Sequence, residues 1–411
     1  MEQFLESTQS NESTTIQSPR LQQLYTEMQI AGGSALLDFW QELEQQGAPL
    51  VEADRDGYSW VTFLWQEDGV ARNIAVLQDF GADGIREHHM QRLPETDLWF
   101  YTRRLRNDTR TTYQFSPSPS ADPNAPGSFQ LDPFNPQTYP GFLFEDGNAI
   151  LFSLLELPDA PPLPWREYRA TQRGTIELHT PFADQRRFWL YTPAVVPATP
   201  LPVLVVFDGR IYKDLTRLPQ ILDYLIDCGQ IPPLLALMVD NPDRNELQCT
   251  VDFAAYVAET VMPWLRAQHP VTDTPSQTAV LGASLGGLAA LYLAYHYPQT
   301  FGIVFTQTGW FRWMPPGETE HHWLARQLAN SPKLPLRLHV QVGNLEIAQM
   351  ADGGPTQVEA NRFMRTVLAA KGYPFDYQEY SGGHDTSSLE APLADGLVAI
   401  FGNMASKNGK E

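Results

Sequence analysis

The sequence predicts two domains: an N-terminal β-sandwich, followed by an α/β domain built around a mainly parallel sheet. Three observations lead to this prediction. The 411 residues are too many for one ordinary domain. Residues from about 58 to 115 alternate apolar and polar side chains, as half-buried strands do. Residues from about 165 to 405 alternate short apolar runs with helical spacing, which is typical of βα units.

The N-terminal part starts with a polar, serine- and threonine-rich stretch, residues 1–18, which we expect to be disordered. Residues 21–44 then carry apolar side chains at helical spacing, with a break at Gly32 and Gly33. Several short strands separated by turn residues suggest the sandwich, which we place at residues 19–150. These expected strands are 59–65, 71–77, 98–102 and 110–115.

Two proline-rich stretches follow these strands. Residues 116–149 are rich in proline, asparagine and glycine, and prolines cluster again between Pro158 and Pro164. We therefore predict a linker at residues 151–164 and a catalytic domain at 165–405. Its expected strands are 187–191, 202–207, 234–239, 277–281, 302–306, 336–342 and 375–380, and its helices include 218–228, 253–266, 323–329, 357–371 and 389–401.

The most informative segment is Gly282-Ala-Ser284-Leu-Gly286, which fits the G-x-S-x-G pattern. An apolar strand precedes it and a helical pattern follows it, so the three parts predict a nucleophile elbow. The serine there sits at a helix N-terminus, where free amides and the dipole favour developing negative charge. Ser284 is therefore the expected nucleophile, and the amide of Leu285 is the expected first oxyanion-hole donor.

A serine hydroxyl needs a base, and in α/β-hydrolases the acid and then the histidine follow the serine along the chain. His384 lies in a glycine-rich loop between the last expected strand and the last helix, so we predict that it is the base. The acid should follow the preceding strand. Glu346 is the favoured candidate there and Asp352 the alternative. Asp385 is adjacent to the base and is not expected to orient it.

A second oxyanion-hole donor should come from the loop after an earlier central strand. That loop is Val205 to Arg210. We expect the amide of Gly209 or of Arg210 to donate, while Asp208 holds the loop in shape.

Composition excludes several other classes of protein. A formal net charge of −20 leaves no basic surplus for nucleic acid and disfavours anionic membranes. No apolar window is long enough to span a bilayer, and the N-terminus has no secretory pattern. Cys228 and Cys249 make no disulfide framework, and no metal-ligand spacing occurs. We therefore expect a cytoplasmic protein with no cofactor and no metal.

Several motifs together resemble the enterochelin (ferric enterobactin) esterase family. The elbow and its helix, Gly282 to Tyr292, resemble G-Q-S-F-G-G-L-S-A-L-Y. The remaining similar segments are Leu131–Gln137, Phe207–Gly209, Gly229–Pro233, Val239 with the following Asp, Glu246–Leu247, Phe301–Gly302, Gln307–Gly309, Gly343–Glu346 and Gly382–Asp385. The chain departs from the family after that last motif, where Thr386-Ser-Ser replaces A-L-C-W.

The resemblance implies an immunoglobulin-like N-terminal domain. It also implies hydrolysis of the serine-lactone esters of a tri-catecholate siderophore, with release of iron. A catechol stacks on aromatic or guanidinium faces. Five residues that follow expected strands could hold it: Arg210, Arg244, Trp310, Arg312 and Trp313. Two alternatives remain, a general carboxylesterase with another substrate and a non-catalytic binding protein on the same scaffold.

Overall fold

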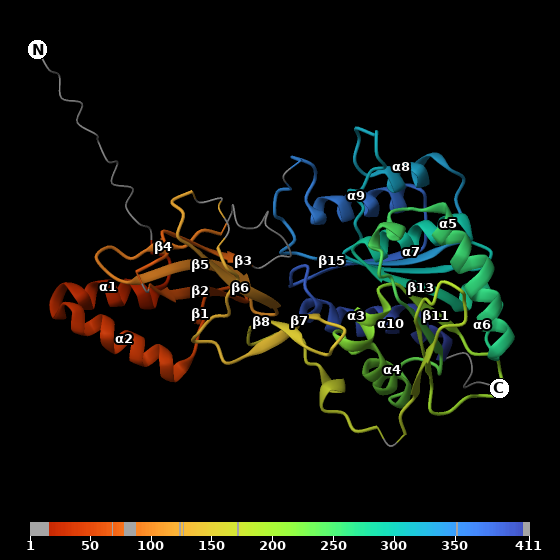
Figure 1. Ribbon diagram of the computed structural model, residues 1–411, viewed down its shortest axis with the longest axis horizontal. Coiled ribbons are helices and arrows are strands. Elements are labelled where there is room, and N and C mark those ends of the chain that lie inside the picture. The colour runs from red at the N-terminus through yellow and green to blue at the C-terminus, as the bar shows by residue number, and fades with distance from the viewer. Residues whose placement is uncertain are drawn as a thin grey trace, which may run out of the picture. The chain divides into compact units, whose positions relative to one another are not determined.

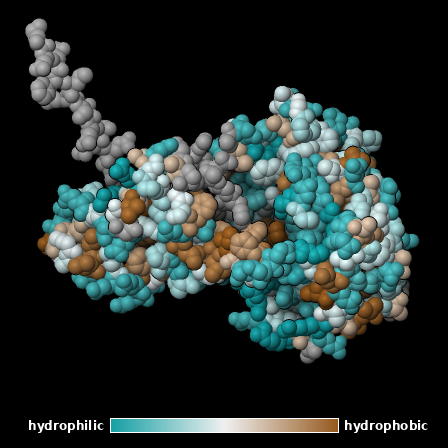
Figure 2. All heavy atoms as spheres, in the orientation of Figure 1, coloured by the Kyte–Doolittle hydropathy of each residue, from teal (hydrophilic) through white to brown (hydrophobic). Residues whose placement is uncertain are grey.

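The computed structural model describes residues 16–67, 69–77, 88–122, 125, 127–170, 172–350 and 352–405. The chain divides into two compact units. The first comprises the described parts of residues 1–77, 85–107 and 114–137, and the second those of 78–84, 108–113 and 138–411. Polar side chains cover most of the described surface in the space-filling view, with scattered apolar patches between them (Figure 2).

The first unit begins with two helices, as the sequence predicted (Figure 1). Helix α1 (Pro19–Ala31) is capped by Ser18, whose hydroxyl accepts a hydrogen bond from the Leu21 amide. The ordered chain therefore starts before residue 19, whereas residues 1–15 of the expected disordered stretch lie outside the described residues. Gly32 at φ 64° ends α1, and α2 (Gly33–Gln46) follows directly, because glycine adopts this backbone conformation without strain.

A four-stranded antiparallel sheet accompanies the two helices, in the order β1-β2-β5-β4. Apolar side chains of α1 and α2 pack with those of β2 and β5 in one buried cluster that includes Leu24, Phe39, Leu64 and Phe100. The N-terminal region is therefore rich in β-structure, as predicted. Its strands are β1 (Leu50–Ala53), β2 (Tyr58–Gln66), β3 (Asn73–Leu77), β4 (Gln91–Arg92), β5 (Leu98–Arg106) and β6 (Arg110–Ser118).

The predicted linker needs a correction, because part of it is a strand. Residues 149–156 form β8, which pairs with β7 (Thr138–Leu143) in a hairpin and with the first residues of β6. The apolar run Ala149–Glu156 supplies the side chains that a strand needs, and the neighbouring proline cluster concealed that signal. The hairpin belongs to the second compact unit, so contacts divide the chain near residue 138 instead of residue 150.

The second unit is the predicted α/β domain, with an eight-stranded sheet in the order β16-β15-β14-β13-β11-β12-β10-β9. All neighbouring pairs from β16 to β12 are parallel, and the pairs β12–β10 and β10–β9 are antiparallel, so β10 alone runs against the other strands. This arrangement is the α/β-hydrolase fold that the sequence predicted. The strands are β9 (Thr175–His179), β10 (Phe188–Thr192), β11 (Val203–Val206), β12 (Leu235–Val239), β13 (Thr278–Ala283), β14 (Ile303–Gln307), β15 (Arg337–Gly343) and β16 (Phe375–Tyr380).

Helices cover both faces of this sheet (Figure 1). Alternate residues of β11 point into two different buried clusters, as the twofold repeat of a strand requires. One cluster packs against α5, α6, α7, α8 and α9, and the other against α4 and α10. The helices are α3 (Gly209–Asp214), α4 (Leu218–Asp227), α5 (Val251–Ala255), α6 (Met262–Gln268), α7 (Leu285–His296), α8 (Trp323–Asn330), α9 (Gln357–Ala370) and α10 (Thr386–Ala405).

The predicted helix 253–266 has a different internal structure from the one expected. A π-helical turn, Tyr256–Val261, joins α5 to α6, so residues 251–268 form one continuous helical run with Pro263 inside it. Proline has no amide hydrogen to donate to the preceding turn, and here that turn is π-helical. No helix within the described ranges is both long and apolar enough to cross a bilayer.

The buried Glu390 on α10 should make a large contribution to stability. Its carboxylate accepts hydrogen bonds from Trp165 Nε1 at 2.6 Å, Arg166 Nη2 at 2.6 Å and Tyr139 Oη at 3.1 Å. We expect Glu390→Ala to lower the free energy of unfolding by about 3–5 kcal/mol, because it leaves the partly buried Arg166 guanidinium and the buried Trp165 indole N–H unpaired, whereas Tyr139 keeps its bond to the Leu215 carbonyl. Chemical denaturation measures this loss.

The matched control is Glu379→Ala, which removes the partner of the exposed Arg362. Exposed ion pairs contribute only about 0–1 kcal/mol, so this variant should unfold nearly as the parent does. Equal losses in the two variants would contradict a special role for Glu390.

Candidate active site

The elbow forms where the G-x-S-x-G pattern predicted it. Strand β13 ends at Ala283, Ser284 has φ 55° and ψ −120°, and α7 begins at Leu285. A side chain at Gly282 would place its Cβ 2.3 Å from the backbone of Gly286, so the strand and helix can approach this closely only with glycine there. The tight turn therefore follows directly from the motif.

The loop after β14 holds the serine backbone on both sides. The amide of Ser284 donates to the carbonyl of Gln307 at 3.0 Å, and the amide of Trp310 donates to the carbonyl of Ser284 at 2.9 Å. Residues 307–310 therefore run alongside the elbow and fix its position.

The same loop reaches the predicted base. His384 lies in the loop between β16 and α10, and its Nδ1 is 2.6 Å from Glu346 Oε2. The imidazole also packs edge-on against the ring of Trp310, with centroids 6.5 Å apart. Glu346 is 3% exposed, and its other oxygen accepts from the amide of Gly343 at 2.8 Å. The carboxylate is thus fixed at the end of β15 and directed at the histidine.

Neither alternative acid occupies that position. Asp352 is paired with Arg312 at 2.5 Å and is half-exposed. The buried Asp385 accepts hydrogen bonds from the Ser387 amide at 3.0 Å and from Thr111 Oγ1 at 2.8 Å. Of the two candidates that the sequence left open, the structure brings Glu346 to the histidine.

Thr308 was not among the predicted site residues, although it lies in Gln307–Gly309, one of the segments on which the resemblance rests. Its hydroxyl lies 3.0 Å from His384 Nδ1, the nitrogen that also faces Glu346. Its φ of 46° is rare for a β-branched residue, and such a conformation costs on the order of 1–3 kcal/mol. Surrounding contacts hold it: its amide donates to Gln341 O at 2.7 Å, and Gln357 Nε2 donates to its carbonyl. Because backbone strain leaves no trace in composition or periodicity, only the structure reveals this residue.

The two expected oxyanion-hole segments lie side by side. Helix α3 begins at Gly209 and α7 begins at Leu285. A Cβ built on Gly286 would lie 3.1 Å from Asp208 Oδ2, which brings the two helix starts into contact. First-turn amides have no acceptor within their own helix, so the amides of Leu285, Gly209 and Arg210 are available to a ligand.

Asp208 shapes the second segment, as expected. It adopts a left-handed conformation with φ 53°, and its amide donates to Asn241 Oδ1 at 2.9 Å. Its carboxylate pairs with Arg244 Nη1 at 2.7 Å. Burial nevertheless raises the pKa of Asp208 to about 6, because the attraction of Arg244 only partly offsets the loss of hydration.

The predicted substrate-binding residues fall into three groups. Arg210 and Arg244 line one cavity of about 270 Å³ beside the second oxyanion segment. Trp310 packs against His384. Arg312 and Trp313 are committed elsewhere: Arg312 is 5% exposed and paired with Asp352, and Trp313 donates to Gln248 Oε1 at 3.2 Å.

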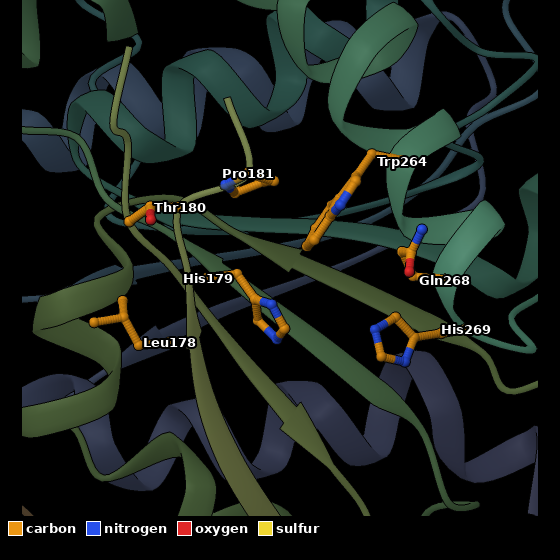
Figure 3. Close-up of a pocket in the computed structure, with 7 residues that line it drawn as sticks. All are labelled: Leu178, His179, Thr180, Pro181, Trp264, Gln268 and His269. Carbon is orange, nitrogen blue, oxygen red and sulfur yellow. The ribbon is translucent and has the colours of Figure 1, made fainter. Parts of the chain in front are cut away.

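A larger cavity, of about 370 Å³, lies away from these residues. Figure 3 shows His179 and His269 next to each other in it, with Trp264 above, and the two imidazole rings lie edge to face with centroids 6.5 Å apart. It is bordered by the end of β9, and strands β11, β12 and β10 separate β9 from β13 in the sheet. At about 4.8 Å per strand, this places the cavity on the order of 20 Å from the elbow strand. Within the described ranges, no group of three or more His, Cys, Asp or Glu side chains could hold a metal ion.

Comparison with known proteins agrees with this architecture. Residues 181–400 match the putative esterase family, and residues 60–166 match the N-terminal region of enterochelin esterases. The iron(III) enterobactin esterase of Dickeya dadantii is 30% identical, over 87% of this chain and 91% of its own. The iron(III) salmochelin esterase of Escherichia coli O6:H1 is 29% identical, over 91% and 96%.

Solved structures show the same likeness. The Shigella flexneri enterobactin esterase, crystallised in the presence of enterobactin, has a TM-score of 0.70 and 25% identity, over 89% of this chain and 98% of its own. The Salmonella typhimurium ferric enterobactin esterase has a TM-score of 0.71 at 24% identity, over 90% and 99%. These matches cover both regions of this chain, and they cover the relatives over nearly their full length. The chain therefore belongs to the enterochelin esterase family.

Proposed function

We propose that this protein is a serine esterase that hydrolyses the serine-lactone esters of a tri-catecholate siderophore and so releases its iron. One observation carries the catalytic part: the pair of Glu346 and His384, 2.6 Å apart, is joined to the Ser284 elbow by the loop 307–310. The names of the relatives support the substrate class, since they are enterobactin and salmochelin esterases.

The first step of the proposed mechanism is acylation. His384 takes the proton of the Ser284 hydroxyl as the oxygen attacks the ester carbonyl carbon. Glu346 accepts a hydrogen bond from Nδ1 of His384 and stabilises the imidazolium that forms. The tetrahedral intermediate then collapses. The ester C–O bond breaks, and His384 returns the proton to the leaving seryl oxygen, which departs as an alcohol.

Negative charge develops on the former carbonyl oxygen during both steps. The amides of Leu285 and of Gly209 or Arg210 are the proposed donors, because they begin adjacent helices, where first-turn amides have no acceptor within the helix. Deacylation repeats the sequence with water as the nucleophile and releases a carboxylate. Because the donors belong to the fixed backbone, they need no rearrangement as the charge forms.

The ferric ion is cargo in this scheme and takes no part in the chemistry. Cleavage of the lactone opens the scaffold that holds the catechols together. The proposed cavity beside Arg210 and Arg244 borders the oxyanion segment and offers cations to an anionic substrate. A cytoplasmic location stays a prediction.

The substrate assignment is tested by incubating the protein with a ferric tri-catecholate trilactone and following linear products by mass spectrometry. We expect cleavage by the parent protein. Ser284→Ala should lower kcat by several orders of magnitude, because the triad acts as a unit. A fluorophosphonate should label Ser284 alone. Cleavage of p-nitrophenyl esters without any cleavage of the catecholate would establish the general carboxylesterase instead, and loss of neither activity in Ser284→Ala would reject the nucleophile.

The role of Glu346 is tested against Asp352, the matched acid on the same segment. Glu346→Gln should fold normally and lose at least about 100-fold in kcat, because the amide cannot hold the same histidine tautomer. Asp352→Asn should keep kcat within about threefold, since its partner is Arg312. Steady-state kinetics on a p-nitrophenyl ester measures both. The reverse ranking would move the acid to Asp352.

Thr308 should act as a positioning residue for His384. Thr308→Val keeps the side-chain shape but removes the hydroxyl, so kcat should fall about 10-fold or more while KM stays nearly constant. Thr308→Ser keeps the hydroxyl and should retain most of the activity. Thermal unfolding of both variants separates a local effect from misfolding. Equal activity in the two variants would show that the hydroxyl has no role.

A further inference from the structure

The cavity beside the oxyanion segment is walled by charged side chains from four separate elements. Glu145 comes from the turn between β7 and β8, Arg187 from the residue before β10, and Arg210 from α3. Asp240 and Arg244 come from the segment after β12. A cavity of about 270 Å³ with converging guanidinium groups is a site for an oxygen anion.

Glu145 already occupies those guanidinium groups. Its two oxygens accept from Arg187 Nη1 at 2.8 Å and Nη2 at 2.9 Å, in the bidentate geometry typical of a bound carboxylate. One of these oxygens also accepts from Arg210 Nη1 at 2.9 Å. The two arginines hold the pKa of Glu145 down to about 2, so the carboxylate is ionised at any working pH.

This carboxylate is nevertheless easy to displace. The Glu145 side chain is 69% exposed, at the tip of a hairpin. Water screens ion pairs at such an exposed position, and the long glutamate side chain regains freedom when it leaves. An incoming carboxylate can therefore compete with Glu145 for the same two arginines.

The arginines would stay in place after Glu145 left. Arg187 Nε donates to Asp240 Oδ2 at 2.7 Å, and the Arg187 guanidinium lies over the ring of Trp189 at 5.4 Å. Arg210 donates to the carbonyl of Phe144 as well. A binding site that keeps its cations in position after releasing its internal carboxylate is preorganised for another carboxylate.

We propose that Glu145 is an internal stand-in for a substrate carboxylate, which replaces it on Arg187 and Arg210. The proposal rests on the proposed function only in taking the substrate to be an ester. Hydrolysis of one serine-lactone ester creates such a carboxylate, so the site distinguishes linear, already opened esters from the cyclic one. It holds the free carboxylate while the next ester of the same molecule reaches Ser284.

The test measures binding by calorimetry and needs no turnover. The probe is 2,3-dihydroxy-N-benzoyl-serine, which carries one carboxylate, and its control is the corresponding neutral serine amide. Glu145→Gln should bind the carboxylate probe about 3- to 10-fold more tightly than the parent protein does, because the competing internal anion is gone. Its affinity for the neutral amide should not change. Arg187→Gln should weaken the carboxylate probe and leave the amide unaffected.

The matched control variant is Asp146→Asn, which removes the same charge from the adjacent residue. Its carboxylate bonds only within the turn, to Asn148. If Asp146→Asn tightens the carboxylate probe as much as Glu145→Gln does, net charge is the cause and the stand-in proposal is wrong. Weaker or unchanged binding in Glu145→Gln, or equal changes for acid and amide, overturns it too.

The outcome is independent of the proposed function. A protein that cleaves no catecholate ester can still show the predicted binding difference, and an active siderophore esterase can fail to show it. Thermal unfolding of Glu145→Gln completes the experiment, because a loss of fold with weaker binding identifies Glu145 as a structural brace and so rejects the proposal.

Discussion

The close approach of strand β13 to helix α7 is the constraint on which the rest of the site depends. Two glycines permit it, since a Cβ on Gly282 would lie 2.3 Å from the backbone of Gly286. The turn between them forces Ser284 to a positive φ and aims the start of α7 at the position where an oxyanion would form. The loop after the neighbouring strand β14 carries Thr308 and Trp310, which contact His384 beside this turn.

A buried network of polar side chains connects the strand ends that carry the site. Tyr212 of α3 donates to Gln307 Oε1 at 3.0 Å, and Gln307 Nε2 donates to Gln341 Oε1 at 3.1 Å. Gln341 in turn lies 2.9 Å from His339 Nε2, and burial lowers the pKa of His339 to about 4, so this imidazole is neutral. The network joins the second oxyanion segment to β14 and β15, the strands whose ends carry Thr308 and Glu346. Unpaired polar groups at this depth would be costly, so the network fixes one arrangement of the strand ends.

The catalytic residues of the candidate site could be predicted from the sequence, whereas several residues that hold them in position could not. The elbow follows from a local motif, and His384 and the favoured acid Glu346 follow from the order of residues along the chain. Neither kind of signal depends on how the elements pack. Thr308 could not be found in this way, because its importance lies in a strained φ and in a contact across 76 residues. Arg312 shows another limit. Its place after a strand suggested a substrate contact, whereas in the structure it is buried and paired with Asp352 from another loop, a partner that spacing along the chain does not indicate.

The strands also differ in how well they could be predicted from local sequence. The parallel strands were predictable because buried strands are continuous apolar runs. Strand β8 was missed because its eight residues adjoin a proline cluster. The residues around a segment do not show which other strand will pair with it. Strand β7 is the hairpin neighbour of β8, but the pairing of β8 with β6 is a long-range contact, and long-range contacts decide strands of ambiguous composition.

The charge distribution explains how an acidic chain can provide a site for anions. With a net charge of −20, long-range attraction is absent, and any anion must be bound by local groups. At the cavity, Arg187, Arg210 and Arg244 face Glu145, Asp240 and Asp208, so positive and negative charges balance one to one. Two of these acids are buried and cannot leave, whereas Glu145 is exposed. Glu145 is the one acid of the three that can move away, and its departure frees the donors of Arg187 and Arg210 that it had occupied. The local field therefore turns positive when the hairpin tip releases its carboxylate, without any change in the net charge of the rest of the protein.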